Sequence, residues 1–349
     1  MRAITEAIEI HKLDLSHLVV LTEGAANYHG TSPVIAALAG SPRVYALVRD
    51  PRERLTAERY GRRLAQWGQS HCRIEAVTIK RPRIVSEADI VTNTGPVRPI
   101  DARMVSMMKN TAVVPLMYES WERRDEDVDI EACRARGIVV VGTDEQRAGV
   151  LKYIGVMSVR QLLSAGIEIV GCRIIVRATN KFGLHVIRAL SRLGAEVIAV
   201  CSLSSSAVSQ AGARRAGSSL RDRTAMRFLR GADALVVVTN PEDAVVVGAG
   251  GEATGATLRR LSPEITVVQF TGLIDRANLW KAGIAFVPTS DPGRGHMGIT
   301  TSSIGPLPRI ILHTASLKVA EVAARARLSG ADPQTAAELA CRKSLGQLV

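Results

Sequence analysis

The sequence predicts an α/β protein with two doubly wound domains, each built on a parallel β-sheet. Short apolar runs of strand length alternate with helical stretches along the chain, which is typical of successive βαβ units. With 349 residues, the chain exceeds the roughly 100–200 residues that one hydrophobic core usually supports. Its 46% hydrophobic and 22% charged residues are typical of well-buried globular proteins.

The first domain is expected over residues 1–148. Its strands are predicted at 17–22, 43–48, 73–79, 89–92, 111–116 and 138–141. Its helices are predicted at 33–39, 52–67, 101–108 and 127–136. Pro33 suits the first turn of its helix, because the N–H that proline lacks has no helical partner there.

The second domain is expected over residues 149–307. Residues 149–165 have apolar positions at helical spacing and precede Gly166, which predicts a connecting helix with a glycine C-cap. Strands are predicted at 173–176, 196–200, 234–239, 266–270 and 285–288, and helices at 184–193 and 220–229. Residues 308–349 are expected to form C-terminal helices that pack back on the first domain.

The composition limits the partners and the location of the protein. The chain has no run of eighteen apolar residues, and Glu6, Glu9 and Asp14 interrupt the apolar positions near the N-terminus. We therefore expect a cytoplasmic protein without a membrane partner. Five cysteines without metal-ligand spacing predict free thiols and no metal site.

The formal net charge of +12 is compatible with nucleic-acid binding, since cationic side chains neutralise phosphates. Aromatic residues make up only 3% of the chain, however, and the basic residues are spread along it. We therefore expect a small-molecule substrate and no nucleic-acid partner. A homodimer is expected as the default assembly of such folds.

A strand, a tight loop and a helix follow one another at 173–193, where dinucleotide-binding folds carry G-x-G-x-x-G. Ala178 and Asn180 stand at the first two glycine positions, and only Gly183 matches. One interpretation is a modified cofactor loop; the other is a similar sheet that no longer binds a cofactor. The first places cofactor-binding residues at Ala178, Thr179, Asn180, Lys181, Phe182, Gly183, Ser202, Ser204, Arg214, Thr239, Asn240, Thr271 and Gly272.

The strand at 196–200 is followed by serines and not by the Asp or Glu that binds the ribose of NAD. Arg214 and Arg215 come next and could bind a 2′-phosphate. NADP is therefore at least as well supported as NAD. The alternative is that these arginines belong to a solvated helix face.

Several of these segments resemble the D-isomer-specific 2-hydroxyacid dehydrogenases, and more loosely the S-adenosylhomocysteine hydrolases and alanine dehydrogenases, all with Rossmann-like NAD(P)-binding domains. The segments are 173–193, Gly231-Ala-Asp233, Gly272-Leu-Ile-Asp275 and Gly295-His296-Met-Gly298-Ile-Thr300. The resemblance implies an NAD(P) cofactor and an acid/base role for His296. An arginine of the family is replaced by Thr271, and Asp291 is the nearest carboxylate to serve the histidine.

Three loops of the first domain directly follow predicted strands, at 22–31, 92–99 and 115–123, and ligands of parallel sheets bind at strand ends. The candidate substrate-binding residues there are Glu23, Asn27, His29, Asn93, Arg98, Tyr118, Glu119 and Arg123. Arg98 and Glu119 join His296 as candidate catalytic residues. For each residue taken alone, the alternative is a loop cap or a surface ion pair.

These observations predict an NAD(P)-dependent dehydrogenase or reductase of biosynthetic metabolism. Its substrate is expected to be a small carboxylate or an amino-acid-like compound, because the loops carry charges of both signs, and to bind between the domains. The alternative is a protein of the same fold without redox turnover. It would be a lyase or hydrolase with a tightly bound cofactor, or a regulatory binding protein.

Overall fold

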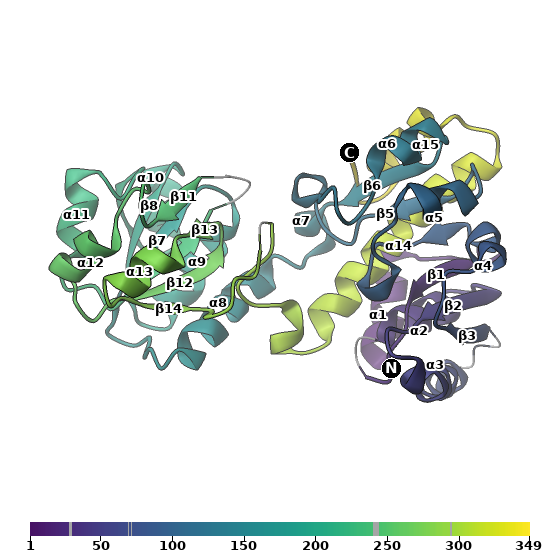
Figure 1. The fold of residues 1–349 in the computed structure, drawn as a ribbon, viewed down its shortest axis with the longest axis horizontal. Coiled ribbons are helices and arrows are strands. Elements are labelled where there is room, and N and C mark those ends of the chain that lie inside the picture. Colours follow the sequence, from purple (N-terminus) through teal and green to yellow (C-terminus); the bar gives the residue numbers. More distant parts are fainter. Residues whose placement is uncertain (28–29, 69, 71, 240–243, 294) are drawn as a thin grey trace. The chain divides into compact units, whose positions relative to one another are not determined.

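The computed structural model describes residues 1–27, 30–68, 70, 72–239, 244–293 and 295–349 (Figure 1). They group into two compact units: unit 1 comprises Met1–Val150 and Pro306–Val349, and unit 2 comprises Leu151–Gly305. Each unit is a doubly wound α/β sheet, and the C-terminal helices belong to unit 1, which confirms the predicted fold class. In the described ranges, no helix combines the length and apolar character needed to cross a membrane.

Unit 1 contains a sheet of order β15-β6-β5-β4-β1-β2-β3. The strands are β1 (Val20–Glu23), β2 (Arg43–Leu47), β3 (Arg73–Val77), β4 (Ile90–Val91), β5 (Val113–Pro115), β6 (Val139–Thr143) and β15 (Gly346–Leu348). All neighbouring strands are parallel except β15, which pairs antiparallel with β6. The central strands are buried on both faces, which explains their continuous apolar character.

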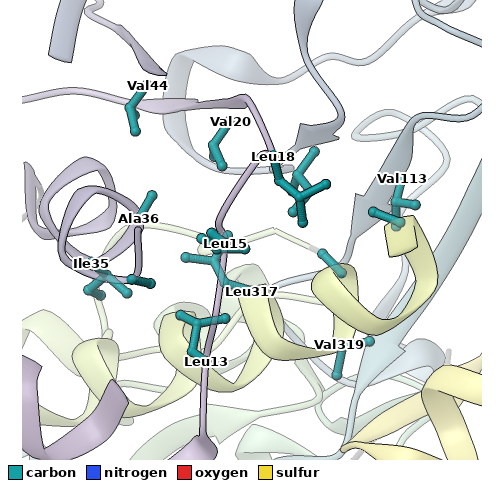
Figure 2. Packing of buried hydrophobic residues seen from close by; sticks show 14 of the residues in the cluster. Leu13, Leu15, Leu18, Val20, Ile35, Ala36, Val44, Val113, Leu317 and Val319 are labelled. Atoms are coloured by element: carbon teal, nitrogen blue, oxygen red, sulfur yellow. The ribbon is translucent and has the colours of Figure 1, made fainter. Parts of the chain in front are cut away.

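One face of this sheet is covered by α1 (Arg2–His11), α2 (Thr31–Leu38), α3 (Arg54–Trp67), α14 (Leu307–Leu328) and α15 (Pro333–Lys343). In Figure 2, Leu317 of α14 lies beside Leu15, in the cluster that also holds Val20 of β1. The other face is covered by α4 (Pro82–Glu87), α5 (Ala102–Met107) and α6 (Ile130–Ala135). The remaining short elements are η2 (Pro51–Glu53), η3 (Gly95–Val97), η4 (Ser120–Glu122) and α7 (Glu145–Ala148).

Unit 2 contains a parallel sheet of order β14-β12-β10-β7-β8-β9. These strands are β7 (Arg173–Ala178), β8 (Glu196–Cys201), β9 (Arg214–Gly217), β10 (Ala234–Val238), β12 (Thr266–Thr271) and β14 (Ala285–Val287). A small parallel pair is formed by β11 (Val245–Val247) and β13 (Leu273–Ile274). The register places Ala178, Cys201 and Val238 together at the carboxyl ends of β7, β8 and β10.

Two sets of helices cover the unit 2 sheet. On one face lie α8 (Lys152–Ser164), α9 (Phe182–Arg192) and α10 (Ser205–Gln210). The other face packs in one hydrophobic cluster with α11 (Arg223–Leu229), α12 (Gly255–Leu261) and α13 (Arg276–Lys281). The short η5 (Thr301–Ile304) ends the unit. Gly155 of α8 lies so close to α9 that a Cβ there would collide with Ala189, so the two helices pack tightly.

Several elements differ from the predictions. The structure contains helices and strands that were not expected, namely α1, α4, α7, α10, α12, α13, β9, β11, β13 and β15. The helix predicted at 220–229 begins at Arg223. The missed strands have two to four residues each, and β9 has the sequence Arg-Arg-Ala-Gly. Segments of this length are too short for a reliable strand pattern, even where they are apolar as in β11, so pairing with neighbours decides their conformation.

A buried ion pair connects three segments of unit 2. The guanidinium of Arg177 in β7, whose side chain is 7% exposed, donates to both carboxylate oxygens of Glu252 at 2.6–3.1 Å. The same carboxylate accepts from the backbone N–H of Leu220 at 2.7 Å. The pair therefore fixes the segments after β9 and β11 to the central strand.

We expect Arg177→Met to lower the free energy of unfolding of unit 2 by about 3 kcal/mol, because Glu252 then keeps its charge without its partner. Arg173→Met is the matched control on the same strand, since its pair with Glu196 is exposed to solvent and such pairs contribute about 0–1 kcal/mol. Urea denaturation followed by circular dichroism measures both. Equal losses in the two variants would contradict the cost expected for leaving the charge of Glu252 buried without a partner.

Candidate functional site

The carboxyl ends of β1, β4 and β5 meet at one edge of the unit 1 sheet, where a pocket of about 500 Å³ opens. Its lining residues are Glu23, Gly24, Ala25, Arg49, Glu53, Asn93, Thr94, Gly95, Pro96, Arg98, Met117, Tyr118 and Arg309. Four of the predicted substrate-binding residues, at positions 23, 93, 98 and 118, are therefore brought together. These four residues lie together because each is at or just after a strand of the same parallel sheet, where ligands of such sheets bind.

A buried ion pair forms one wall of the pocket. Glu23, the last residue of β1, accepts a hydrogen bond from Arg309 in the first turn of α14. The two side chains are 9% and 14% exposed. Gly95, at φ +47°, leaves room for the carboxylate, because a Cβ there would collide with Oε2 of Glu23. Burial lowers the pKa of Arg309 to about 10, so its guanidinium is still charged at neutral pH.

The pocket lining includes two buried donors without acceptors. Asn93 is 2% exposed; its Oδ1 accepts from the N–H of Met117 at 2.9 Å, while its Nδ2 has no partner among the described residues. The Nε of Arg309 is likewise buried and unpartnered within the described ranges. A buried donor without an acceptor costs about 1–3 kcal/mol. A ligand oxygen that reached either donor would recover that cost.

The other charges of the pocket are largely paired. Arg98 donates to Asp127 at 2.8 Å, and the hydroxyl of Tyr118 and the guanidinium of Arg124 donate to the same carboxylate oxygen. Burial raises the pKa of Tyr118, so its hydroxyl keeps its proton. Arg49 is exposed and makes no ion pair or hydrogen bond within the described part of the chain. The hydrogen-bonding capacity left for a ligand therefore belongs mainly to donors.

Three further predicted residues of unit 1, Asn27, Glu119 and Arg123, are not part of this pocket lining. Glu119 is buried and accepts from the indole N–H of Trp121 at 2.5 Å. Arg123 is exposed and lines a different surface pocket, together with Asp125 and Asp129. Asn27 is exposed in the loop after β1. His29 lies outside the described residues.

In unit 2, the turn between β7 and α9 keeps one feature of a dinucleotide loop and changes another. Gly183 lies so close to β7 that a Cβ there would collide with the Cβ of Ala178, so glycine is needed for helix–strand packing. The side chain of Asn180 accepts from the N–H of Phe182 at 3.0 Å. Backbone acceptors take the N–H groups of Thr179 and Gly183. Several N–H groups that could face a phosphate are therefore already bonded within the chain.

The ends of β10 and β12 carry two buried hydroxyls without a hydrogen-bond partner among the described residues. The hydroxyls of Thr239 and Thr271 are buried and unpartnered within the described ranges, and Gly272, at φ +91°, lies directly against Thr239. Asn240 lies outside the described residues. These orphaned hydroxyls at the carboxyl edge fit a nicotinamide dinucleotide, which when bound would supply hydride chemistry there. The residues that would hold it are the 179–183 turn, Thr239 and Thr271.

The predicted residues near the end of β8 occupy distinct positions. Ser202 is exposed just after the strand, and Ser204 caps α10 by accepting from the N–H of Ala207 at 3.2 Å. Arg214 begins β9 and lies over the ring of Phe228, with 5.4 Å from its Cζ to the ring centroid. The proposed helix face is therefore wrong for Arg214 and Arg215, which belong to a strand.

His296 is exposed in the loop after β14. Its N–H donates to the carbonyl of Gly293 at 3.2 Å, and Gly298 anchors the loop by donating to the carbonyl of Phe270 at 2.8 Å. The carboxylate of Asp291 accepts from the N–H of Gly293 at 2.9 Å and lies 3.4 Å from Arg276. Arg276 thus links this loop to α13, a connection that the sequence did not indicate.

No family model matches the chain, and no curated protein is similar to it in sequence. Solved structures are similar in fold. A dipicolinate synthase subunit from Bacillus halodurans is 14% identical, with a TM-score of 0.57 over 90% of this chain and 99% of its own. A putative D-3-phosphoglycerate dehydrogenase from Ralstonia solanacearum is 13% identical, with a TM-score of 0.53 over 91% and 97%. The pyruvate reductase of Chlamydomonas reinhardtii is 12% identical, with a TM-score of 0.53 over 90% and 98%.

These likenesses define the class of fold. The chain shares a Rossmann-like fold with these synthase, dehydrogenase and reductase structures, and the resemblance that its sequence carries is confirmed at the level of the fold. At 12–14% identity, the likeness carries no assignment of substrate or cofactor to this chain.

The pair at the pocket wall can be tested by a double-mutant cycle. We expect Glu23→Gln and Arg309→Met each to lower the free energy of unfolding by about 3–5 kcal/mol, because each leaves one buried charge unpaired. The double variant should lose less than the sum, with an interaction free energy of about 1–3 kcal/mol. The exposed pair Arg2 and Glu6 is the control, and its double-mutant cycle should give an interaction free energy close to zero. Strictly additive losses at the pocket would show that the two side chains are not coupled.

Proposed function

We propose that this protein is a nicotinamide-dependent oxidoreductase that reduces or oxidises a small carboxylate at the 2-oxo or 2-hydroxy position. The observation that carries the proposal is the unit 1 pocket, whose two unpartnered buried groups, on Asn93 and Arg309, are both hydrogen-bond donors. A carboxylate or carbonyl oxygen is the acceptor that such donors bind. The fold and the orphaned hydroxyls of Thr239 and Thr271 support a dinucleotide in unit 2.

A simple carboxylate is favoured over an amino-acid-like substrate. The ammonium group of an amino acid needs an acceptor, yet Glu23 is already paired with Arg309 and Asp127 with Arg98. Glu53 is the other carboxylate of the lining, and it is exposed. Glu23 and Asp127 are therefore engaged within the protein, whereas the buried donors of Asn93 and Arg309 have no acceptor among the described residues.

His296 is the proposed acid/base. When bound, a reduced nicotinamide would supply the hydride chemistry, and His296 would hold the proton that the carbonyl oxygen of the substrate takes up. An imidazole suits this role because its pKa lies near neutral pH. His296 is exposed in a loop that contains Gly293 and Gly298, and glycines permit the backbone bends that expose a side chain beyond a strand. Glu119 is not proposed as catalytic, since it is buried against Trp121.

A second candidate function is a protein of this fold without redox turnover. The specific observation in its favour is the 179–183 turn, where Asn180 occupies the N–H of Phe182 and the carbonyls of Val238 and Asn180 take two more N–H groups. A pyrophosphate would have to displace the Asn180 side chain or bind elsewhere on the edge. Binding of the dinucleotide therefore decides between the two candidates.

We expect NADH or NADPH to bind with enhanced nicotinamide fluorescence, and a panel of 2-oxo acids to be reduced. Asn93→Asp should raise KM for the 2-oxo acid about 10–100-fold and leave dinucleotide affinity unchanged, because the donor is replaced by an anionic oxygen while Oδ1 still accepts from Met117. Asn110→Asp, an exposed site of unit 1, is the matched control. Absence of dinucleotide binding at millimolar concentration would falsify the redox function.

His296→Asn should lower kcat about 10²–10⁴-fold while the dissociation constant of the dinucleotide and the melting temperature stay nearly unchanged. His17→Asn, at an exposed histidine of unit 1, is the control for the same chemical change away from both sites. Steady-state kinetics, fluorescence titration and thermal denaturation of both variants give the three values. A fall in melting temperature with weakened binding would instead make His296 a structural residue of its loop.

A further inference from the structure

Two consecutive arginines in β9 point to opposite faces of the unit 2 sheet, because side chains alternate along a strand. Arg214 lies over Phe228 on the face that Ala216 shares with the α11 cluster. Arg215 points to the other face and donates from its Nε to the carbonyl of Cys201 at 3.1 Å. The two residues therefore have different surroundings despite their identical chemistry.

The strand register brings the Arg215 guanidinium toward the carboxyl edge. Arg215 pairs with Ala199 of β8, two residues before Cys201, where that strand ends. Its side chain spans this interval, and its Nε is fixed by the Cys201 carbonyl. Its two Nη groups have no hydrogen-bond partner within the described ranges. An anchored guanidinium with two available nitrogens suits a phosphate, which accepts two parallel hydrogen bonds.

The strand end to which this guanidinium is anchored is followed in the sequence by hydroxyl-bearing residues and by no acid before Asp222. No Asp or Glu occurs between positions 197 and 221, and β8 is followed directly by the serines at 202, 204, 205 and 206. A site for NAD places a carboxylate at the end of this strand to accept from the ribose hydroxyls. Serine hydroxyls can donate to a phosphate as readily as they accept from a ribose.

Asp222 is the carboxylate that could oppose this arrangement. Its Oδ2 accepts from the N–H groups of Ser218 and Ser219 at 2.7 and 3.0 Å, just beyond the end of β9. These backbone bonds hold the pKa of Asp222 below its ordinary value, and the charges of Arg215 and Arg177 lower it further. Its oxygens are thus partly engaged, yet they remain a competing acceptor for ribose hydroxyls.

We propose that Arg215, and not its neighbour Arg214, selects an adenine dinucleotide that carries a 2′-phosphate over one that does not. The proposal rests on the dinucleotide site proposed for unit 2 and adds the residue that sets its preference. The guanidinium of Arg214 lies over the ring of Phe228. The guanidinium of Arg215 lies at the end of β8, and its Nη groups are still able to donate to a ligand. If the nucleotide carried no 2′-phosphate, the carboxylate of Asp222 would instead accept hydrogen bonds from the two ribose hydroxyls.

Calorimetric titration of the full chain with adenosine 2′,5′-bisphosphate and with adenosine 5′-monophosphate tests this proposal without any turnover. The unchanged protein should bind the bisphosphate more tightly. Arg215→Met should weaken the bisphosphate about 10–100-fold and leave the monophosphate unchanged, because a charge-assisted phosphate contact is lost. Arg214→Met, one residue away, is the matched control and should keep the preference.

The outcomes separate this proposal from the function on which it rests. Binding of both nucleotides with equal affinity, or equal losses in the two arginine variants, would overturn the role of Arg215 and leave the dinucleotide site intact. A preference for the monophosphate that Asp222→Asn abolishes would assign the ribose to Asp222 instead. If neither nucleotide binds at millimolar concentration to the folded chain, the dinucleotide site itself is absent and both proposals fail.

Discussion

Burial of a parallel sheet on both faces leaves its strand ends as the places where polar groups can meet a ligand. In each unit the faces are filled by apolar clusters under two sets of helices. Most side chains of the central strands are buried in apolar packing. Those of Val20, Val113 and Val236, for example, have only packing contacts. Polar groups for a ligand are therefore expected at or just after the carboxyl ends of the strands, where both candidate sites of this protein lie.

Buried arginine–glutamate pairs organise these strand ends. Glu23 is joined to Arg309 from the C-terminal helix, and Arg177 joins Glu252 from the loop after β11. Such pairs contribute little net stability, because desolvation of the two charges offsets most of their attraction. Their effect is conformational: removal of either partner leaves an uncompensated charge, so the loops that carry the partners are restricted to one arrangement. A pocket of fixed shape and fixed donors follows from that restriction.

The sequence predicts the fold and part of the pocket because both depend on local patterns. Apolar runs mark the strands, and the loop after each strand yields Glu23, Asn93, Arg98 and Tyr118. Arg309 escapes this reasoning, since it lies 286 positions from Glu23 in a helix with no distinguishing pattern. Glu119 shows the opposite failure: its position after β5 is right, but a neighbouring indole takes its carboxylate. Side-chain direction and distant partners are decided by packing, which local patterns do not encode.

The turn after β7 separates two roles that glycines usually combine in a dinucleotide loop. Gly183 retains the packing role, because Ala178 leaves no space for a Cβ. Ala178 and Asn180 replace the two glycines that usually allow the backbone to approach the pyrophosphate. The side chain of Asn180 accepts a hydrogen bond from the N–H of Phe182, which a ligand could otherwise use. The cost of displacing one neutral side-chain hydrogen bond is about 0.5–1.5 kcal/mol, which is smaller than the gain from one charge-assisted bond to a phosphate, about 1.5–3 kcal/mol. In the proposed dinucleotide site, the asparagine would therefore weaken phosphate binding at this turn without abolishing it, and the neighbouring strand ends would have to supply the remaining affinity.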